Sequence, residues 1–83
     1  MSKHYLKELC ELLAEINQPA EMKEFLLGIL TPKEREELPK RLQIVKMLKA
    51  GVAQREIAAK LNVGISTVTR GAREIQNGRF KNI

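Results

Sequence analysis

The stretch from Gln54 to Ile75, QREIAAKLNVGISTVTRGAREI, decides the fold. It contains two runs of apolar residues at three- and four-residue intervals, the spacing of one face of an α-helix. The runs consist of Ile57, Ala58 and Leu61, and then of Ile65, Val68, Ala72 and Ile75. Each run is too short to form a stable helix alone. The pattern therefore predicts two short helices that pack on each other.

The link between these helices, Asn62-Val63-Gly64, is typical of a tight turn. Asn and Gly tolerate a positive φ, and the apolar Val63 can point back into the angle between the helices. The small side chains of Ala58 and Ala59 would let the second helix cross close to the first. Together these features predict a helix-turn-helix, whose second helix enters the DNA major groove.

The other side of the second helix carries side chains that can form hydrogen bonds or are cationic. They are Ser66, Thr67, Thr69, Arg70 and Arg73. Such side chains suit base edges and phosphates. The distribution of charge agrees, because residues 52–83 hold six basic and two acidic residues, whereas residues 1–51 hold nine and eight. Most of the net charge of +5 thus lies in the half that is predicted to meet DNA.

The length and composition indicate one small all-helical domain. The chain has 83 residues, of which 43% are hydrophobic, with two Phe, one Tyr and no Trp. The single Cys10 cannot form an internal disulfide, and no apolar run is long enough for a membrane span or a signal peptide. We therefore expect a cytoplasmic protein without a membrane segment, in which Cys10 is a small hydrophobe of a helix.

Three further helices are expected over residues 3–16, 20–29 and 32–50. Thr31, Pro32 and Glu34 form a strong start signal for the third, as the N-cap, the first helical residue and the capping-box partner. Gly51 should end it. Pro39 lies inside this helix, where a proline removes a hydrogen bond and clashes with the preceding turn. The sequence therefore predicts a kink at Pro39 or a break into two helices.

The apolar faces of these three helices are broader than one small chain can cover. The main positions are Leu6, Leu9, Leu13 and Ile16 in the first helix, Met22, Phe25, Leu26 and Ile29 in the second, and Leu38, Leu42, Val45 and Leu48 in the third. A homodimer interface would use the surplus, and it would place two reading helices about one DNA turn apart. We expect a dimerisation core over 1–51, a helix-turn-helix over 52–77 and a mobile basic tail over 78–83.

Four motifs occur in a specific order: Leu30–Glu36 (LTPKERE), Arg41 followed by Ile44-Val45, Gln54–Glu56 (QRE) and Gly64–Gly71 (GISTVTRG). In this order they resemble the tryptophan operon repressor family, over about residues 25–75. The resemblance implies an intertwined, all-helical homodimer of about five helices, a palindromic DNA operator and L-tryptophan as a corepressor. It implies no further cofactor.

The resemblance also implies a tryptophan site. Arg41 and Arg70 would sandwich the indole ring, with Arg70 or Thr31 meeting the carboxylate. Thr67 and Gly71 would line the floor, and the backbone around Gly28 and Leu30 of the partner subunit would receive the ammonium group. Guanidinium planes stack on aromatic rings and bind carboxylates. Glu74 stands where the family usually has Ser, and it could pair with the ammonium group or with Arg70.

The implied DNA contacts lie on both helices of the helix-turn-helix. Gln54 and Arg55 would contact a phosphate or a base near the start of the first helix. Ile65, Ser66 and Thr69 would face the groove, and Arg73 lies on the same exposed side.

Three functions stay open at this point. The first is a repressor that responds to L-tryptophan. The second is a DNA-binding regulator without the amino acid, in which Arg70 and Glu74 form a structural pair and Gly71 serves only helix packing. The third is a helical adaptor or dimerisation module. An enzyme is not expected, because the chain has no Asp, one His, one Cys and no phosphate-binding glycine loop, and hence no catalytic constellation or metal site.

Overall fold

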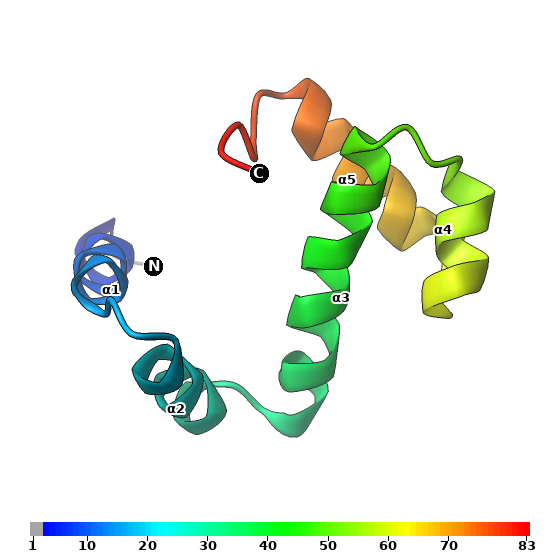
Figure 1. Ribbon diagram of the computed structural model, residues 1–83. Coiled ribbons are helices and arrows are strands. Elements are labelled where there is room, and N and C mark those ends of the chain that lie inside the picture. The colour runs from blue at the N-terminus through cyan, green and yellow to red at the C-terminus, as the bar shows by residue number, and fades with distance from the viewer. Residues whose placement is uncertain (1–2) are drawn as a thin grey trace. The chain divides into compact units, whose positions relative to one another are not determined.

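The structure, a computed structural model, describes residues 3–83 as five α-helices without a β-strand in that range (Figure 1). The helices are α1 (Lys3–Glu15), α2 (Pro19–Ile29), α3 (Pro32–Lys49), α4 (Gln54–Leu61) and α5 (Ile65–Gln76). The predicted all-α class is thereby confirmed, and each helix boundary lies within one residue of its expected position. In the part of the chain that is described, no helix is both long and apolar enough to cross a bilayer.

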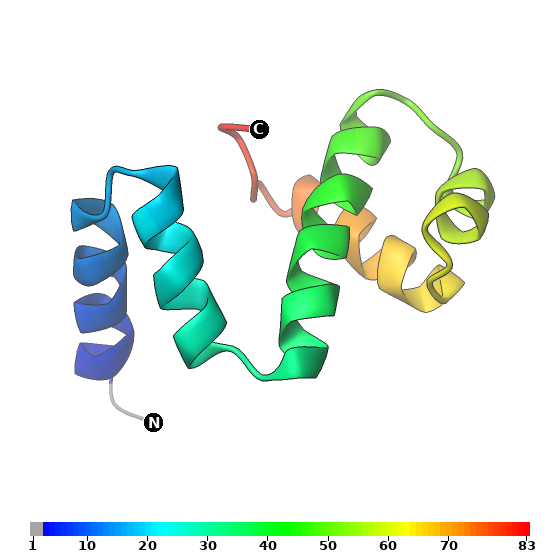
Figure 2. The same ribbon diagram turned by 60° about the horizontal axis from the view of Figure 1, so that its bottom comes forward.

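Contacts divide the chain after Arg35 into two compact units. The first contains α1, α2 and the start of α3, and Figure 2 shows the chain reversing its direction between α1 and α2. Pro19 occupies the first turn of α2, where its missing N–H costs no helical hydrogen bond. The division of the sequence into 1–51, 52–77 and 78–83 stays a prediction.

The start of α3 is fixed by the capping box that the sequence predicts. The Thr31 N–H donates to Glu34 Oε1 at 2.9 Å, and the Glu34 N–H donates to Thr31 Oγ1 at 3.3 Å. Arg35 Nη2 donates to the Leu27 carbonyl oxygen at 2.9 Å, which ties this first turn to α2. The reciprocal bonds satisfy donors that a helix start leaves open.

The core of the second unit lies where α3, α4 and α5 meet (Figures 1 and 2). One residue from each helix is almost fully buried: Ile44 at 1% exposure, Ile57 at 0% and Val68 at 0%. Val45 of α3 is also buried, at 3%. Partly buried Met47, Leu48, Val52, Ala58, Leu61 and Val63 surround the cluster. The two helices of the predicted helix-turn-helix are therefore mounted on the second half of α3.

Two expectations for α3 need correction. Ile44, given only a broadening role, is in the core, while Leu38 and Leu42 of the predicted apolar face are 43% and 46% exposed, as expected of a face that one chain cannot cover. The reason is that α4 and α5 pack on the side of α3 that carries Ile44. The helix also runs without interruption through Pro39, so the predicted alternative of a break is wrong.

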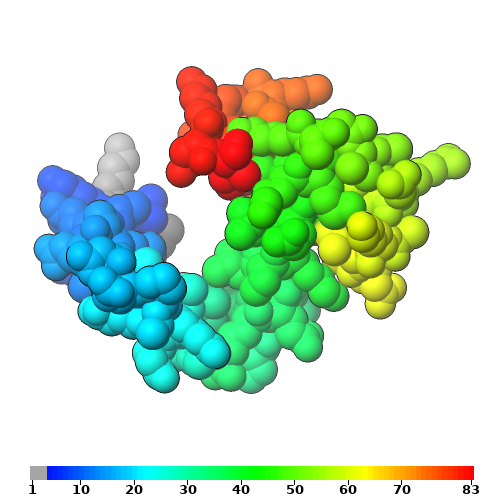
Figure 3. All heavy atoms as spheres, in the orientation of Figure 1, coloured from blue at the N-terminus to red at the C-terminus, as the bar shows by residue number. Residues whose placement is uncertain are grey.

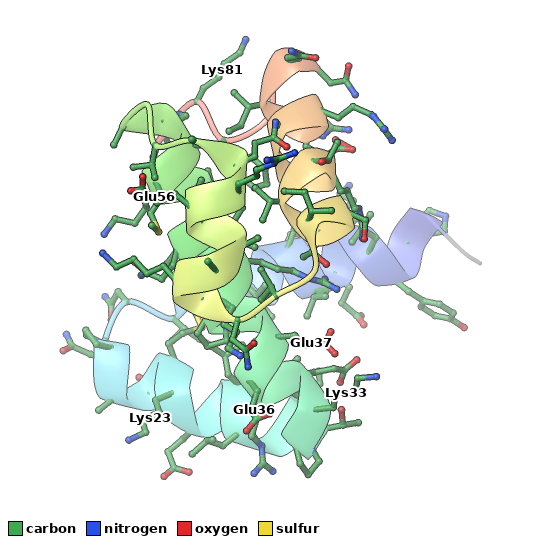
Figure 4. The ribbon with its side chains drawn as sticks, turned by 90° about the vertical axis from the view of Figure 1, so that its right-hand side faces the viewer. Lys23, Lys33, Glu36, Glu37, Glu56 and Lys81 are labelled. Carbon is green, nitrogen blue, oxygen red and sulfur yellow. The ribbon has the colours of Figure 1, made fainter. Side chains whose placement is uncertain are left out.

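The C-terminal segment, residues 78–83, contacts the end of α3, and its predicted mobility stays a prediction. Lys49 Nζ donates to the carbonyl oxygens of Phe80 and Ile83, the latter at 2.9 Å. In the space-filling view the red C-terminal atoms lie against the green surface of α3 (Figure 3). The ammonium group thus links the last residue of α3 to a segment 31 to 34 positions further on. Figure 4 shows Lys81 of this segment with its side chain extended away from the helices.

Candidate nucleic-acid interface and ligand-binding residues

The turn between α4 and α5 is left-handed at Asn62, as predicted, but not at Gly64. Asn62 ends α4 with φ 54° and ψ 52°, the left-handed conformation expected of it. The following Val63 N–H donates to the Ala58 carbonyl oxygen at 3.0 Å, and the Val63 side chain packs on the core as predicted. Gly64, however, has φ −68°, which any residue can adopt, so it needs no glycine for a positive φ.

The small residues of α4 share the predicted packing role unequally. Ala58 is half-buried against the core cluster, where a larger side chain would hold the helices apart. Ala59 is exposed, so the expectation that both alanines permit the close crossing is right for Ala58 and wrong for Ala59. Glu56 also lies on the exposed side of α4 (Figure 4).

The predicted DNA-binding side chains lie on the solvent side of this helix pair. Those of α5 that are exposed are Ile65, Ser66, Thr69 and Arg73, and Arg55 of α4 is exposed as well. Val68, in the middle of the same stretch, is fully buried and holds α5 in place. A polar and cationic surface on a helix whose opposite side is packed has the chemistry that base edges and phosphates require.

One contact within this surface was not predicted. Thr69 Oγ1 lies 2.9 Å from Gln54 Oε1 and 3.0 Å from the Ile65 carbonyl oxygen. Gln54, the first residue of α4, is half-buried, unlike the other predicted DNA-binding residues. The spacing of 15 residues between Gln54 and Thr69 carries no helical periodicity, so only the crossing of α4 and α5 reveals this pair.

The residues of the implied tryptophan site are divided between the two units. Thr31, Gly28 and Leu30 belong to the first, and Arg41, Thr67, Arg70, Gly71 and Glu74 to the second. Four of them share α5 at positions 67, 70, 71 and 74, which lie along one side of a helix. Thr67 and Arg70 are exposed, and Gly71 and Glu74 are half-buried. The structure therefore brings the α5 members together on one side of that helix.

Two charged residues of this set already have partners. Arg41 Nη2 lies 3.4 Å from Glu37 Oε2, one turn earlier on α3, and Figure 4 shows Glu37 on that helix. Glu74 Oε1 lies 3.9 Å from Arg79 Nε. The alternative in which Glu74 pairs with Arg70 is not what residues 3–83 display, since the ion pair of Glu74 is made with Arg79. Both pairs are partly exposed, and such pairs open at little cost.

Gly71 is a packing position. A Cβ atom at this residue would lie 3.2 Å from Ile44 Cγ2 and 3.5 Å from Leu48 Cδ1, so the absence of a side chain lets α5 approach α3 closely. Gly28 differs, because a Cβ atom there would meet nothing within 4 Å. Gly71 therefore serves close helix packing, and whether it also lines a ligand site stays a prediction.

These features define the class: a small all-α protein that presents a helix-turn-helix. The chain belongs to the family described as Trp repressor protein, whose profile matches residues 4–82. It is 44% identical over 62 residues to a Trp operon repressor homolog of Vibrio campbellii, covering 74% of this chain and 60% of the relative. A Trp operon repressor homolog of Xylella fastidiosa is 38% identical over 74 residues, covering 88% and 80%. No solved structure is significantly similar to the chain.

Proposed function

We propose that this protein is a transcriptional repressor that binds duplex DNA through α4 and α5. The main observation in support is that α5 has a buried side at Val68 and an exposed side at Ser66, Thr69 and Arg73. Membership in the Trp repressor protein family supports it. This is a family of regulators, and we assign no catalytic step and no cofactor to the chain. The basic half of the sequence supplies the charge that a polyanion attracts.

The proposed repressor works as a homodimer. Large apolar side chains are exposed on α1, α2 and α3, and they include Tyr5 at 71%, Leu6 at 58%, Leu9 at 37%, Leu12 at 44%, Leu27 at 38%, Ile29 at 55%, Leu38 at 43% and Leu42 at 46%. Taking a large apolar side chain from full exposure to full burial gains about 1.5–3 kcal/mol, so each of these partly exposed side chains gains a fraction of that amount. A second copy of the chain would cover them, and its two-fold symmetry would suit a palindromic operator.

We further propose that L-tryptophan is the corepressor. Arg41 and Arg70 would stack on the indole ring, while Arg70 or Thr31 would bind the carboxylate. Thr67 and Gly71 would line the floor, and Glu74 together with backbone around Gly28 and Leu30 of the partner subunit would receive the ammonium group. This arrangement requires Arg41 to leave Glu37, a weak exposed pair. The ligand must bind the DNA-competent state more tightly than the other state in order to act as a switch.

The alternative is a DNA-binding regulator that does not use tryptophan. It is favoured by the structural partners of three residues of the site, since Arg41 pairs with Glu37, Glu74 with Arg79, and Gly71 packs on Ile44. A helical adaptor that does not bind DNA is the third possibility, and the exposed cations of α5 argue against it.

An equilibrium titration of the purified chain with duplex DNA separates these functions. The duplex is selected from a randomised pool, and binding is measured with and without L-tryptophan over a series of salt concentrations. A repressor gated by tryptophan binds more tightly when the amino acid is present, and its affinity falls steeply with salt. Equal affinity with and without L-tryptophan would exclude it as a corepressor. Binding that is absent or independent of salt would favour the adaptor.

A further inference from the structure

The hydrogen bond between α4 and α5 joins the two surfaces that are proposed to meet DNA. Thr69 comes from the second turn of α5, and Gln54 is the first residue of α4. The two side-chain oxygens are 2.9 Å apart. Beneath them the helices are held by the fully buried Ile57 and Val68, so the polar contact lies above a packed core.

The Thr69 hydroxyl is held on two sides. It contacts the Ile65 carbonyl oxygen one turn earlier in its own helix, at 3.0 Å, and Gln54 Oε1 at 2.9 Å. The hydroxyl has one proton, so its hydrogen bond to Gln54 Oε1 is shared with the Ile65 carbonyl oxygen as a three-centre bond, and a β-branched side chain in a helix has few rotamers. Its position is therefore set by α5, and Gln54 adjusts to it rather than the reverse.

The carboxamide of Gln54 is held by its oxygen and keeps its amide nitrogen for another partner. Within residues 3–83, no hydrogen bond is made by that nitrogen, which carries two N–H donors. A carboxamide fixed through its oxygen loses little conformational entropy when the nitrogen binds an acceptor. A free glutamine side chain loses more, because its rotamers must be ordered on binding. Phosphate oxygens are the most frequent acceptors in DNA complexes.

We propose that Thr69 is a positioning residue: it holds Gln54 so that the amide N–H groups of Gln54 donate to a DNA phosphate. This inference rests on the proposed DNA binding. It replaces the expected direct contact of Thr69 with a base by an action through Gln54. The contact is between neutral and anionic groups, and it is made to the backbone, so it contributes to operator and non-specific binding alike.

A double-mutant cycle tests the proposal. Thr69→Val removes the hydroxyl and keeps the β-branched shape, and Gln54→Leu removes the carboxamide. Affinities are measured for the selected duplex and for a scrambled duplex, at a temperature where circular dichroism shows every variant to be folded. Each single substitution should weaken both duplexes about three- to tenfold, the range of one hydrogen bond. The double variant should be no weaker than Gln54→Leu alone.

Three controls keep the outcomes distinct. Thr69→Ser retains the hydroxyl and should bind like the wild type, while Gln43→Leu, an exposed position of α3, should leave both affinities unchanged. The salt dependence of Gln54→Leu should match that of the wild type, because no charge is removed. Additive losses in the double variant, or a Thr69→Ser variant as weak as Thr69→Val, would overturn the positioning role. A wild-type chain that binds no DNA would instead overturn the proposed function.

Discussion

The contact of Gly71 with α3 gives a prediction whose sign depends on the size of the added side chain. Alanine at this position adds a methyl group 3.2 Å from Ile44 Cγ2, a contact that Ile44 must relieve by a few tenths of an ångström. Ile44 is 1% exposed and packed on all sides, so we expect overpacking to cost about 1 kcal/mol. Replacing a glycine inside a helix by alanine gains about 0.8–1.0 kcal/mol. The two effects nearly cancel, and Gly71→Ala should unfold within about 1 kcal/mol of the wild type.

Valine at the same position should be clearly destabilising. It adds two more methyl groups toward Ile44 and Leu48, and β-branching returns about half of the gain in helix propensity. With overpacking at the upper end of about 1–3 kcal/mol, the net loss is about 2 kcal/mol. For a domain of this size that corresponds to a decrease in Tm of about 8–16 °C.

Gly28 provides the matched control for these two variants. It also lies in a helix, in the last turn of α2, but an added Cβ meets nothing within 4 Å. Gly28→Ala should therefore be stabilised by up to about 1 kcal/mol, and Gly28→Val should stay near the wild type. Thermal unfolding followed by circular dichroism at one protomer concentration measures all four variants. If Gly71→Val were as stable as Gly28→Val, the close approach of α5 to α3 would be refuted.

Three other predictions concern single side chains. Ile57→Ala empties a fully buried position between α4 and α5 and should cost about 2–5 kcal/mol of unfolding free energy in chemical denaturation; a loss below about 1 kcal/mol would contradict the core. Thr31→Ala removes the hydroxyl of the capping box and should cost about 1 kcal/mol, whereas Thr31→Ser, which keeps it, should cost less. Arg70→Ala should abolish calorimetric binding of L-tryptophan while size-exclusion chromatography still shows a folded dimer, and loss of the dimer would make Arg70 structural.

The five helices and the helix-turn-helix could be predicted from the sequence because their signals are local. Ile57 and Val68 recur at helical spacing, and Thr31 with Glu34 forms a capping box through residues three apart. The position of Ile44 could not be predicted, since apolar residues occur on several sides of α3 and only the packing of α4 and α5 selects one. The same limit applies to Lys49 and residues 78–83, whose contacts span more than thirty positions.

The candidate site shows the limit of a residue pattern more sharply. Spacing along α5 correctly separates Val68, which is buried, from Ser66 and Arg73, which are exposed. It does not distinguish a threonine that touches DNA from one that holds another side chain, and Thr69 contacts Gln54. Spacing also allowed Glu74 to pair with Arg70, whereas its ion pair is with Arg79, outside α5. A polar side chain at a predicted surface therefore needs its partners before its role can be assigned.

In the proposed tryptophan-controlled repressor, α5, a helix of twelve residues, takes part in both ligand binding and DNA binding. Thr67, Arg70 and Glu74 follow one side of α5, while Thr69 contacts α4 on another. Because Val68 and Gly71 pack α5 on the core, α5 is expected to move together with the residues on which it packs. The proposed ligand would then act by selecting an orientation of α4 and α5 together. The uninterrupted α3 joins Thr31 at its start to Ile44 under α5, so it is the element that would transmit that selection.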